Sequence, residues 1–277
     1  MTWQPRLVAL DIDRTLVSPD EQVTPAVRDA VRAAAAAGAH VVLSTGRSVY
    51  GVEPVLDLLG LSDGYCVASN GAVVCTYRPM TVVQTVTFDA TAAVEALLAE
   101  VPDALVAVEA IGDGYRVNRH FPAGEISGRI WVEPVANLIR EPVTRVIVRD
   151  PASTAEDFVS LAAALGLHGT SYFVGYTAWL DLAPEGVSKA SGLAKVAESL
   201  GVARADVLAI GDGRNDVEML AWAGRGVAMG GVFEEVLAAA DDVTGTFAAD
   251  GVATELARWF PGGNGRVDQP VHEVGSR

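Results

Sequence analysis

Four apolar residues at positions 7–10 run directly into two aspartates, Asp11 and Asp13. A short apolar run bounded by polar residues is typical of a strand buried on both faces, as in a parallel sheet covered by helices. Strand side chains two apart start on the same side, and ligands bind at the carboxyl ends of parallel strands in open α/β sheets. The pair is therefore expected at a ligand-binding edge, although a solvated Asp turn explains the same residues.

Two carboxylates at this spacing repel each other unless a cation joins them. Oxygen ligands with some retained water suit Mg²⁺, and a carboxylate held beside that ion can attack phosphorus to form an aspartyl phosphate. The first strand end thus indicates metal-dependent phosphoryl chemistry.

Further polar loops follow other apolar runs. Residues 39–43 predict a second strand, which ends in Ser44, Thr45, Gly46 and Arg47. These residues offer a hydroxyl, a glycine and a cation to a phosphate, yet they also suit an ordinary strand-to-helix turn. After a third strand at 65–68, the Asn-Gly pair at 70–71 predicts a tight hairpin.

The second half of the chain supplies a lysine and more acids. Lys189 falls in the first turn of a helix predicted over 188–200, where a cation opposes the helix dipole, so the position suits an anion-binding site better than a stabilising role. A solvated surface lysine is the alternative. The apolar run 207–210 then leads into Asp212, Asn215 and Asp216, a second acid-rich strand end.

Strand and helix patterns alternate over 1–80 and 186–260, which predicts a catalytic α/β core built from both segments. Between them, residues 81–185 mix hairpins with helices and predict an α+β domain with an antiparallel sheet. Trp131 and Trp179 in this segment are expected in its core rather than on a lid surface. Residues 261–277, rich in glycine and polar residues, are expected to be a disordered tail.

The charge of −15 disfavours a nucleic-acid backbone or an anionic membrane surface as partner. The apolar run before Asp11 is too short for a signal peptide or a membrane span, so a cytoplasmic location is expected. Cys66 and Cys75 lack the neighbours of a zinc site and are expected to be two reduced thiols rather than a disulfide. The sequence does not indicate an oligomeric state.

Four motifs together resemble, in order and spacing, those of the haloacid dehalogenase superfamily of phosphohydrolases. They are 11–15 (DIDRT), Thr45 in STGR, Lys189 in GVSK, and 211–216 (GDGRND). The SNGA stretch at 69–72 and the length of the insertion are similar to the Cof-type subfamily. The resemblance implies a Rossmann-like, doubly wound parallel sheet core with an inserted α/β cap domain. It also implies a phosphatase that acts on a small phosphorylated metabolite, and a sugar phosphate is the expected class of substrate.

The resemblance also implies a role for each matching residue. Asp11 is the nucleophile, and Asp13 protonates the leaving oxygen and then activates water. Mg²⁺ lies between Asp11, the carbonyl of Asp13, and Asp212. The phosphate-binding residues are Thr45, Gly46, Lys189 and Asn215, while Asp216 orients Lys189 or a water on the metal, and Arg14 and Arg47 are candidate substrate contacts.

Position 14 departs from the pattern, because Cof-like sequences usually carry a small residue there and this chain has arginine. Glycine adopts loop conformations that other residues adopt at a cost, so the conformation of this loop is the question that Arg14 raises.

Two further functions compete with hydrolysis. One is a phosphosugar mutase with the same core and cap, and the other is a non-enzymatic phospho-acceptor module, whose lysine would follow the acids instead of preceding Asp212.

Overall fold

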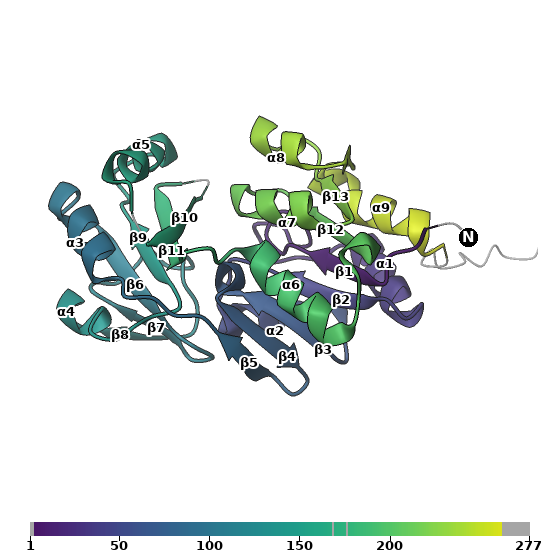
Figure 1. The fold of residues 1–277 in the computed structure, drawn as a ribbon, viewed down its shortest axis with the longest axis horizontal. Helices are drawn as coiled ribbons and strands as arrows, with labels where there is room; N and C mark the ends of the chain where they lie inside the picture. Colours follow the sequence, from purple (N-terminus) through teal and green to yellow (C-terminus); the bar gives the residue numbers. More distant parts are fainter. Residues whose placement is uncertain (1–2, 168, 176, 262–277) are drawn as a thin grey trace, which may run out of the picture.

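The computed structural model describes residues 3–167, 169–175 and 177–261. Its strands form one sheet of eight strands and one of six, which follow each other along the longest axis of the molecule (Figure 1). Helices and strands alternate along the chain, and the larger sheet is mostly parallel. The predicted α/β class with a parallel core is confirmed.

The eight-stranded sheet places β1 near its centre, in the order β14-β13-β12-β1-β2-β3-β4-β5. Its first six strands in this order are parallel, and β4 and β5 are added antiparallel at one edge. The strands are β1 (Leu7–Leu10), β2 (His40–Ser44), β3 (Gly64–Ala68), β4 (Val73–Tyr77), β5 (Thr81–Thr85), β12 (Val207–Gly211), β13 (Arg225–Ala228) and β14 (Asp242–Val243).

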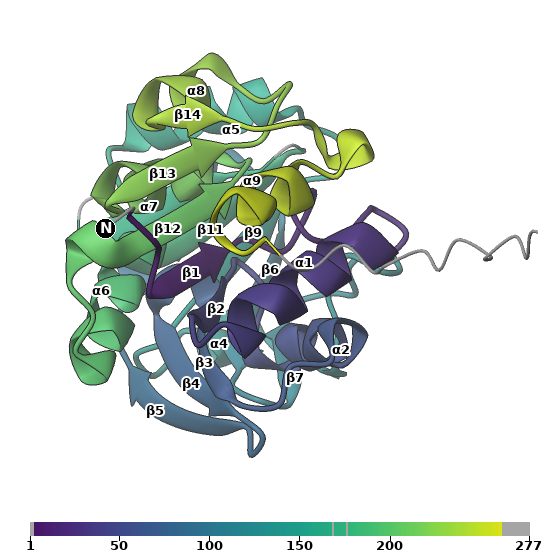
Figure 2. The same ribbon diagram turned by 90° about the vertical axis from the view of Figure 1, so that its right-hand side faces the viewer.

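Helices cover both faces of this sheet because its central strands are apolar on both sides. Val8 and Leu10 of β1 face one hydrophobic cluster, while Leu7 and Ala9 face another. The first cluster includes α1 (Pro25–Ala36), α2 (Val49–Leu59) and α9 (Gly251–Trp259). The second includes α6 (Lys189–Leu200), α7 (Val217–Trp222) and α8 (Glu234–Ala239). Figure 2 shows α1, α2 and α9 on one side of β1 and α6 on the other.

The six-stranded sheet runs in the order β10-β11-β9-β6-β7-β8. Its pairs are antiparallel, as predicted, except for the parallel pair β7 and β8. The strands are β6 (Leu105–Ala110), β7 (Gly114–Val117), β8 (Arg129–Val132), β9 (Val146–Arg149), β10 (Thr170–Val174) and β11 (Trp179–Pro184).

Helices lie on one face of this second sheet. A hydrophobic cluster joins its strands to α3 (Thr91–Glu100), α4 (Val135–Leu138) and α5 (Ala155–Leu165), which lie on the side away from the larger sheet (Figure 1). The opposite face has only a small apolar cluster around Tyr115 and Ile147 among the described residues. That face is therefore available to the loops of the larger sheet.

Two predicted boundaries can be compared with the strands. Residues 81–85, assigned from the sequence to the inserted domain, form β5 and pair with β4 at the edge of the larger sheet. The connection from this sheet to the second therefore begins after β5. The tail predicted for 261–277 lies, apart from Pro261, outside the described residues.

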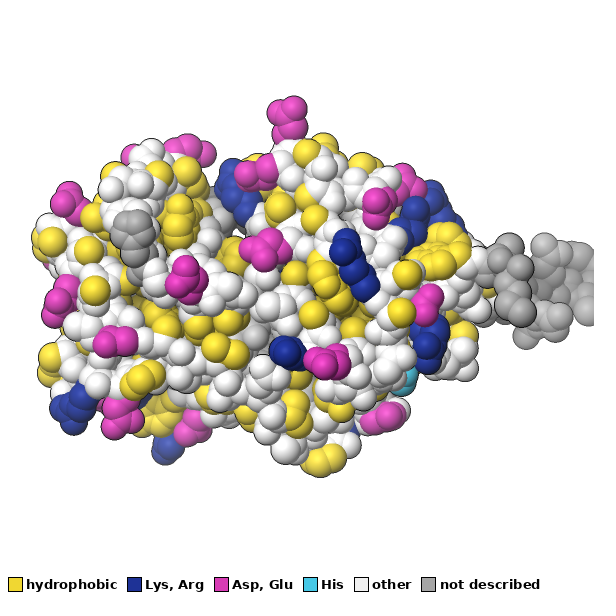
Figure 3. Space-filling model, in the orientation of Figure 1, with side chains coloured by type: hydrophobic (Ala, Val, Ile, Leu, Met, Phe, Trp, Pro, Cys, Tyr) yellow, Lys and Arg dark blue, Asp and Glu magenta, His cyan; other side chains and the backbone are white. Residues whose placement is uncertain are grey.

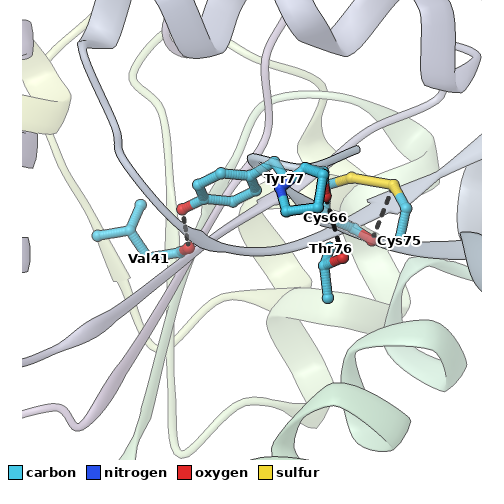
Figure 4. Close-up of a disulfide and its surroundings, with 6 residues drawn as sticks. Val41, Cys66, Cys75, Thr76 and Tyr77 are labelled. Carbon is cyan, nitrogen blue, oxygen red and sulfur yellow. Dashed lines mark hydrogen bonds between the residues drawn. A yellow bond between two sulfur atoms is a disulfide. The ribbon is translucent and has the colours of Figure 1, made fainter. Parts of the chain in front are cut away.

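Cys66 and Cys75 form a disulfide, so the expectation of two reduced thiols is wrong. The two residues lie directly opposite each other on β3 and β4, with Cα atoms 5.3 Å apart, a separation that suits a disulfide. Figure 4 shows the bond beside Tyr77, whose hydroxyl donates to the carbonyl of Val41 at 3.1 Å. The hairpin over 64–77 is confirmed, and its register, which the sequence did not supply, explains the pairing.

Charged side chains are spread out on one face of the molecule. On the face drawn in Figure 3, acidic side chains are scattered over the parts built on both sheets, and basic side chains are separated by other residues. Within the described part of the chain, no helix has the length and apolar character needed to cross a bilayer.

A short 3₁₀ turn, η1 (Ser69–Gly71), connects β3 to β4 and lies against the start of α6. Gly71 has φ of +101°, and a Cβ at this position would lie 2.0 Å from the carbonyl oxygen of Ser188. This close approach needs glycine, because both the backbone angle and the available space exclude a side chain.

Gly71→Ala should therefore destabilise the protein by about 3 kcal/mol or more, since backbone has to move in addition to the cost of the left-handed conformation. Urea unfolding of the variant and wild type measures the difference. Gly38→Ala is the matched control, because Gly38 also has positive φ but has open space where its Cβ would lie. Its loss should stay near 1–2 kcal/mol, and equal losses in the two variants would contradict the steric argument.

Candidate active site

The end of β1 delivers two aspartates to different surroundings. The amide of Asp11 donates to the carbonyl of Ile210 at 3.0 Å, which extends the pairing of β1 with β12 by one step. Asp11 is buried, with 4% of its surface exposed. The side chain of Asp13 is 58% exposed and faces Arg47. The two acids therefore differ in environment despite being two residues apart.

Lys189 is fully buried at the first position of α6, and it is not a solvated surface lysine. Its Nζ donates to Oδ1 of Asp11 at 2.6 Å and to Oδ1 of Asp216 at 2.7 Å. Burial lowers the pKa of Lys189, but the two carboxylates raise it above its ordinary value, so the side chain stays charged. The helix begins here because Ser188 caps it, accepting from the amide of Ser191.

Asp216 folds back onto its own loop. Its Oδ2 accepts from the backbone amides of Asp212 and Gly213, at 3.0 and 2.9 Å. A Cβ on residue 211 would lie 2.4 Å from the carboxyl carbon of Asp216, so Gly211 makes room for this turn. Asp212 is also buried and accepts from the hydroxyl of Thr15 at 3.0 Å.

Three buried carboxylates, those of Asp11, Asp212 and Asp216, each have an oxygen within 4.8 Å of the others. Burial raises the pKa of Asp11 well above its ordinary value; Lys189 opposes that shift, and the neighbouring carboxylates add to it. A hard divalent cation would relieve the crowding, and oxygen donors of this kind fit Mg²⁺. Because Asp216 accepts hydrogen bonds at both oxygens, Asp11 and Asp212 are the better placed of the three to hold the ion.

The loop after β2 is held by backbone hydrogen bonds. Thr45 is fully buried, its amide donates to the carbonyl of Val67 at 2.8 Å, and its hydroxyl accepts from the amide of Arg47 at 3.0 Å. A Cβ on Gly46 would lie 3.1 Å from Oδ1 of Asn70, so glycine permits a close approach of the two loops. The Thr45 and Gly46 positions are thereby fixed beside the ends of β1 and β3.

Asn70 is a functional candidate that sequence reasoning missed. Its side-chain Oδ1 accepts a hydrogen bond from Nδ2 of Asn215 at 2.9 Å, and its backbone amide donates to the carbonyl of Thr45 at 3.0 Å. Asn70 thus connects two of the predicted phosphate-binding loops. The Asn-Gly hairpin was a signal for this turn, but not for the direction of the Asn70 side chain.

Arg47 contacts acids of the protein itself. Its guanidinium donates to Asp13 at 2.6 Å and to Glu21 at 2.7 Å. Burial alone would lower the pKa of Arg47, but these hydrogen bonds raise it above its ordinary value. The structure thus gives Arg47 a role in positioning Asp13. Glu21, which sequence reasoning missed, lies in a loop with no motif.

Arg14 adopts φ of +60°, a left-handed conformation that glycine adopts at lower cost. Its amide still donates to the carbonyl of Val17 at 2.9 Å, so the loop closes despite the arginine. Arg14 also lines the cavity described next, which keeps it a candidate substrate contact.

A cavity of about 360 Å³ lies between the two sheets. Its floor includes Asp11, Asp13 and Asp212, and its roof includes residues of the six-stranded sheet that the sequence did not single out as site residues. Among those roof residues are Tyr115, Arg145 and Asp181. Trp179, expected in the core, is half-buried and also lines the roof.

A buried contact joins the second sheet to the η1 turn. The hydroxyl of Ser69, in the η1 turn, donates to Glu109 on β6, which also accepts from the hydroxyl of Thr144 at 3.3 Å. Burial raises the pKa of Glu109, and these hydrogen bonds oppose that shift. The second sheet is thus tied to the loop that positions Asn70.

Comparison with known proteins identifies one family. Its model, that of the haloacid dehalogenase-like hydrolases, matches residues 8–256. A phosphoglycolate phosphatase of Natronomonas pharaonis is 33% identical over 251 residues, which cover 91% of this chain and 96% of the relative. The 5-amino-6-(5-phospho-D-ribitylamino)uracil phosphatase YitU of Bacillus subtilis is 29% identical over 282 residues, with coverages of 94% and 99%.

Solved structures show the same similarity. A phosphatase of the haloalkanoate (HAD) enzyme superfamily from Bacteroides thetaiotaomicron superposes with a TM-score of 0.75 at 28% sequence identity. The match covers 92% of this chain and 95% of the other. The similarity therefore includes both sheets.

Arg14→Gly tests whether the loop after β1 depends on the arginine backbone. Glycine removes the cost of the left-handed conformation from the folded state, about 1 kcal/mol. It also raises the entropy of the unfolded chain, which favours unfolding. The two effects oppose each other, so the free energy of unfolding should change by less than about 1 kcal/mol. Thermal unfolding measures the change. A loss above about 2 kcal/mol would show instead that contacts of the Arg14 side chain hold the loop.

Proposed function

We propose a reaction for this chain on the premise that it belongs to the haloacid dehalogenase-like hydrolase family and is a phosphoric monoester hydrolase of the Cof type. The reaction is Mg²⁺-dependent hydrolysis of a small phosphorylated metabolite, with a sugar phosphate as the class, through an aspartyl phosphate on Asp11. One observation carries the proposal: a buried lysine joins Asp11 to Asp216 beside Asp212, at the carboxyl ends of β1 and β12.

Asp11 is the nucleophile in this proposal. Lys189 holds Oδ1 at 2.6 Å, which fixes the carboxylate and leaves Oδ2 for attack on phosphorus. Attack forms the bond from the Asp11 oxygen to phosphorus and breaks the bond from phosphorus to the leaving oxygen. Positioning of this kind supplies much of the acceleration in phosphoryl transfer, because the protein has little covalent chemistry to perform.

Asp13 is the general acid and then the general base. It gives its proton to the leaving oxygen in the first step, and takes a proton from the water that attacks the aspartyl phosphate in the second. Its side chain lines the cavity, and the proton that it takes from water in the second step replaces the one that it gave to the leaving oxygen in the first. Arg47 positions the carboxyl by hydrogen bonds to both oxygens, at 2.6 and 3.1 Å.

The remaining residues bind the phosphoryl group and the ion. Thr45, Gly46, Asn215 and Lys189 would hold the phosphoryl oxygens, and Asp216 keeps Lys189 in place. Asp11, the carbonyl of Asp13, and Asp212 would hold Mg²⁺, which when bound neutralises charge on the transferring group. Each of these roles follows from the resemblance, and the contacts described above support them.

The proposal is tested by phosphate release from a panel of phosphorylated sugars, polyols, nucleotides and carboxylates with Mg²⁺ present. Turnover of at least one small ester, lost on addition of EDTA, is the expected result. Formation of an isomerised sugar phosphate without free phosphate would identify a mutase instead. A stable phosphoprotein without turnover would identify a phospho-acceptor module.

Asp11→Asn should reduce kcat for an aryl phosphate by at least about three powers of ten, because the amide is a poor nucleophile and a weaker metal ligand. The variant keeps nearly the same shape and should remain folded by circular dichroism. Asp29→Asn, at a partly exposed aspartate on α1, is the matched control and should keep wild-type turnover. Wild-type turnover by Asp11→Asn would refute the covalent mechanism.

Asp212→Asn should raise the Mg²⁺ concentration needed for half-maximal activity by about tenfold or more, because a carboxylate ligand is replaced by a neutral amide oxygen. Activity measured over a Mg²⁺ titration gives this value, and excess metal should restore part of the rate. The same Mg²⁺ dependence in variant and wild type would remove Asp212 from the metal site.

A further inference from the structure

Four side chains on the roof of the cavity form one hydrogen-bonded cluster, which the proposed chemistry does not use. Nε of Arg145 donates to Oδ1 of Asp181 at 2.6 Å, and its NH1 donates to the hydroxyl of Tyr115 at 3.0 Å. Nε1 of Trp179 donates to Oδ2 of Asp181 at 3.1 Å. All four residues line the cavity opposite the catalytic acids.

The cluster is neutral overall, and its two charged members are buried. Arg145 and Asp181 are only 5% and 9% exposed, so water screens their charges weakly. Because the carboxylate of Asp181 already compensates the guanidinium of Arg145, the pair offers little net attraction to a further anion. The side chains that line the cavity include six acidic residues and four arginines, so the lining as a whole carries no net positive charge to attract a second anionic group.

The cluster nevertheless offers polar atoms suited to hydroxyl groups. A guanidinium has donors beyond the two used here, and carboxylate and phenol oxygens accept more than one hydrogen bond. Trp179, which is half-buried, adds flat apolar surface beside these polar atoms. Uncharged groups that carry several hydroxyls can use both kinds of surface.

We propose that Arg145 and Asp181 act together as a specificity-determining pair, which selects an uncharged, hydroxyl-rich leaving group and rejects one that carries a second anion. This inference rests on the proposed hydrolysis and adds the chemistry of the leaving group. It places the chain with relatives that release a neutral polyol-bearing product, as YitU does by its name, rather than with those that release a carboxylate such as glycolate.

Two substrates that differ by a single carboxylate test the pair. Sorbitol 6-phosphate ends in a hydroxymethyl group where 6-phosphogluconate ends in a carboxylate, and their carbon chains are otherwise alike. Wild-type enzyme should favour sorbitol 6-phosphate in kcat/KM by at least about tenfold. An equal or reversed preference would overturn the proposal.

Single variants of the pair should move this preference in opposite directions. Asp181→Asn removes the carboxylate that is hydrogen-bonded to Arg145, and should raise the relative kcat/KM for 6-phosphogluconate by about tenfold. Arg145→Gln leaves Asp181 uncompensated and should lower it by a similar factor. In the double variant the pair is neutral again, so the ratio of kcat/KM values for the two substrates should lie within about threefold of the wild-type ratio.

Asp103→Asn is the matched control for added charge. It makes the same substitution in the part of the chain built on the second sheet, at a side chain that is 95% exposed and does not line the cavity. The substrate ratio should stay at the wild-type value. The proposal would be overturned if the substrate ratio shifted in the same direction in Asp181→Asn and Arg145→Gln, or in neither. Structural damage alone would not shift the ratio in opposite directions in variants of opposite charge.

Thermal unfolding checks each variant, and if Asp181→Asn does not fold, Arg145→Gln and the double variant carry the comparison. Turnover of an aryl phosphate separates a failure of the specificity pair from a failure of the proposed hydrolysis. Wild-type enzyme that hydrolyses the aryl ester but neither hexose derivative would overturn the specificity pair alone. Failure on every ester would overturn the proposed hydrolysis itself.

Discussion

The buried ammonium group of Lys189 is the interaction on which the rest of the site depends. It lies between the carboxylates of Asp11 and Asp216, which come from β1 and from the loop after β12 and would repel each other without it. Removing one partner from a buried ionic contact typically costs about 3–5 kcal/mol, because the remaining charge is left without compensation. Lys189 is therefore a structural element as well as a proposed phosphate ligand, and a loss of activity on its removal would have two physical causes.

The parallel sheet explains why distant segments meet at this lysine. β2, β1 and β12 are neighbours in the sheet, so the loops that follow them open at one edge. Glycines then set the fine spacing: Gly211 gives room to the Asp216 carboxyl, and Gly71 lets η1 approach the start of α6. The site thus arises from strand order first and from close backbone approach second.

Sequence patterns predicted the parts of the structure that depend on local order. The hairpin over 64–77, the buried first strand and the helix that starts at Lys189 all follow from apolar runs and caps. The patterns could not give the register that pairs Cys66 with Cys75, the addition of β5 to the larger sheet, or the parallel pairing of β7 with β8. The roof was missed for the same reason, because Arg145 and Asp181 are 36 residues apart and meet only through the pairing of β9 with β11.

The floor and the roof of the cavity differ in how their charges are compensated, and under the two proposals above this difference separates the reacting groups from those that select the leaving group. The floor gathers acids around one lysine and can accept a divalent cation, which suits a dianionic phosphoryl group. The roof balances its own charges within one ion pair, that of Arg145 and Asp181. The two regions are still linked mechanically, because Ser69 donates to Glu109 of the second sheet while its amide donates to the carbonyl of Arg47 at 2.8 Å. A leaving group that seats poorly against the roof can therefore disturb the loop that positions Thr45, which makes selectivity visible in the rate of the chemical step as well as in binding.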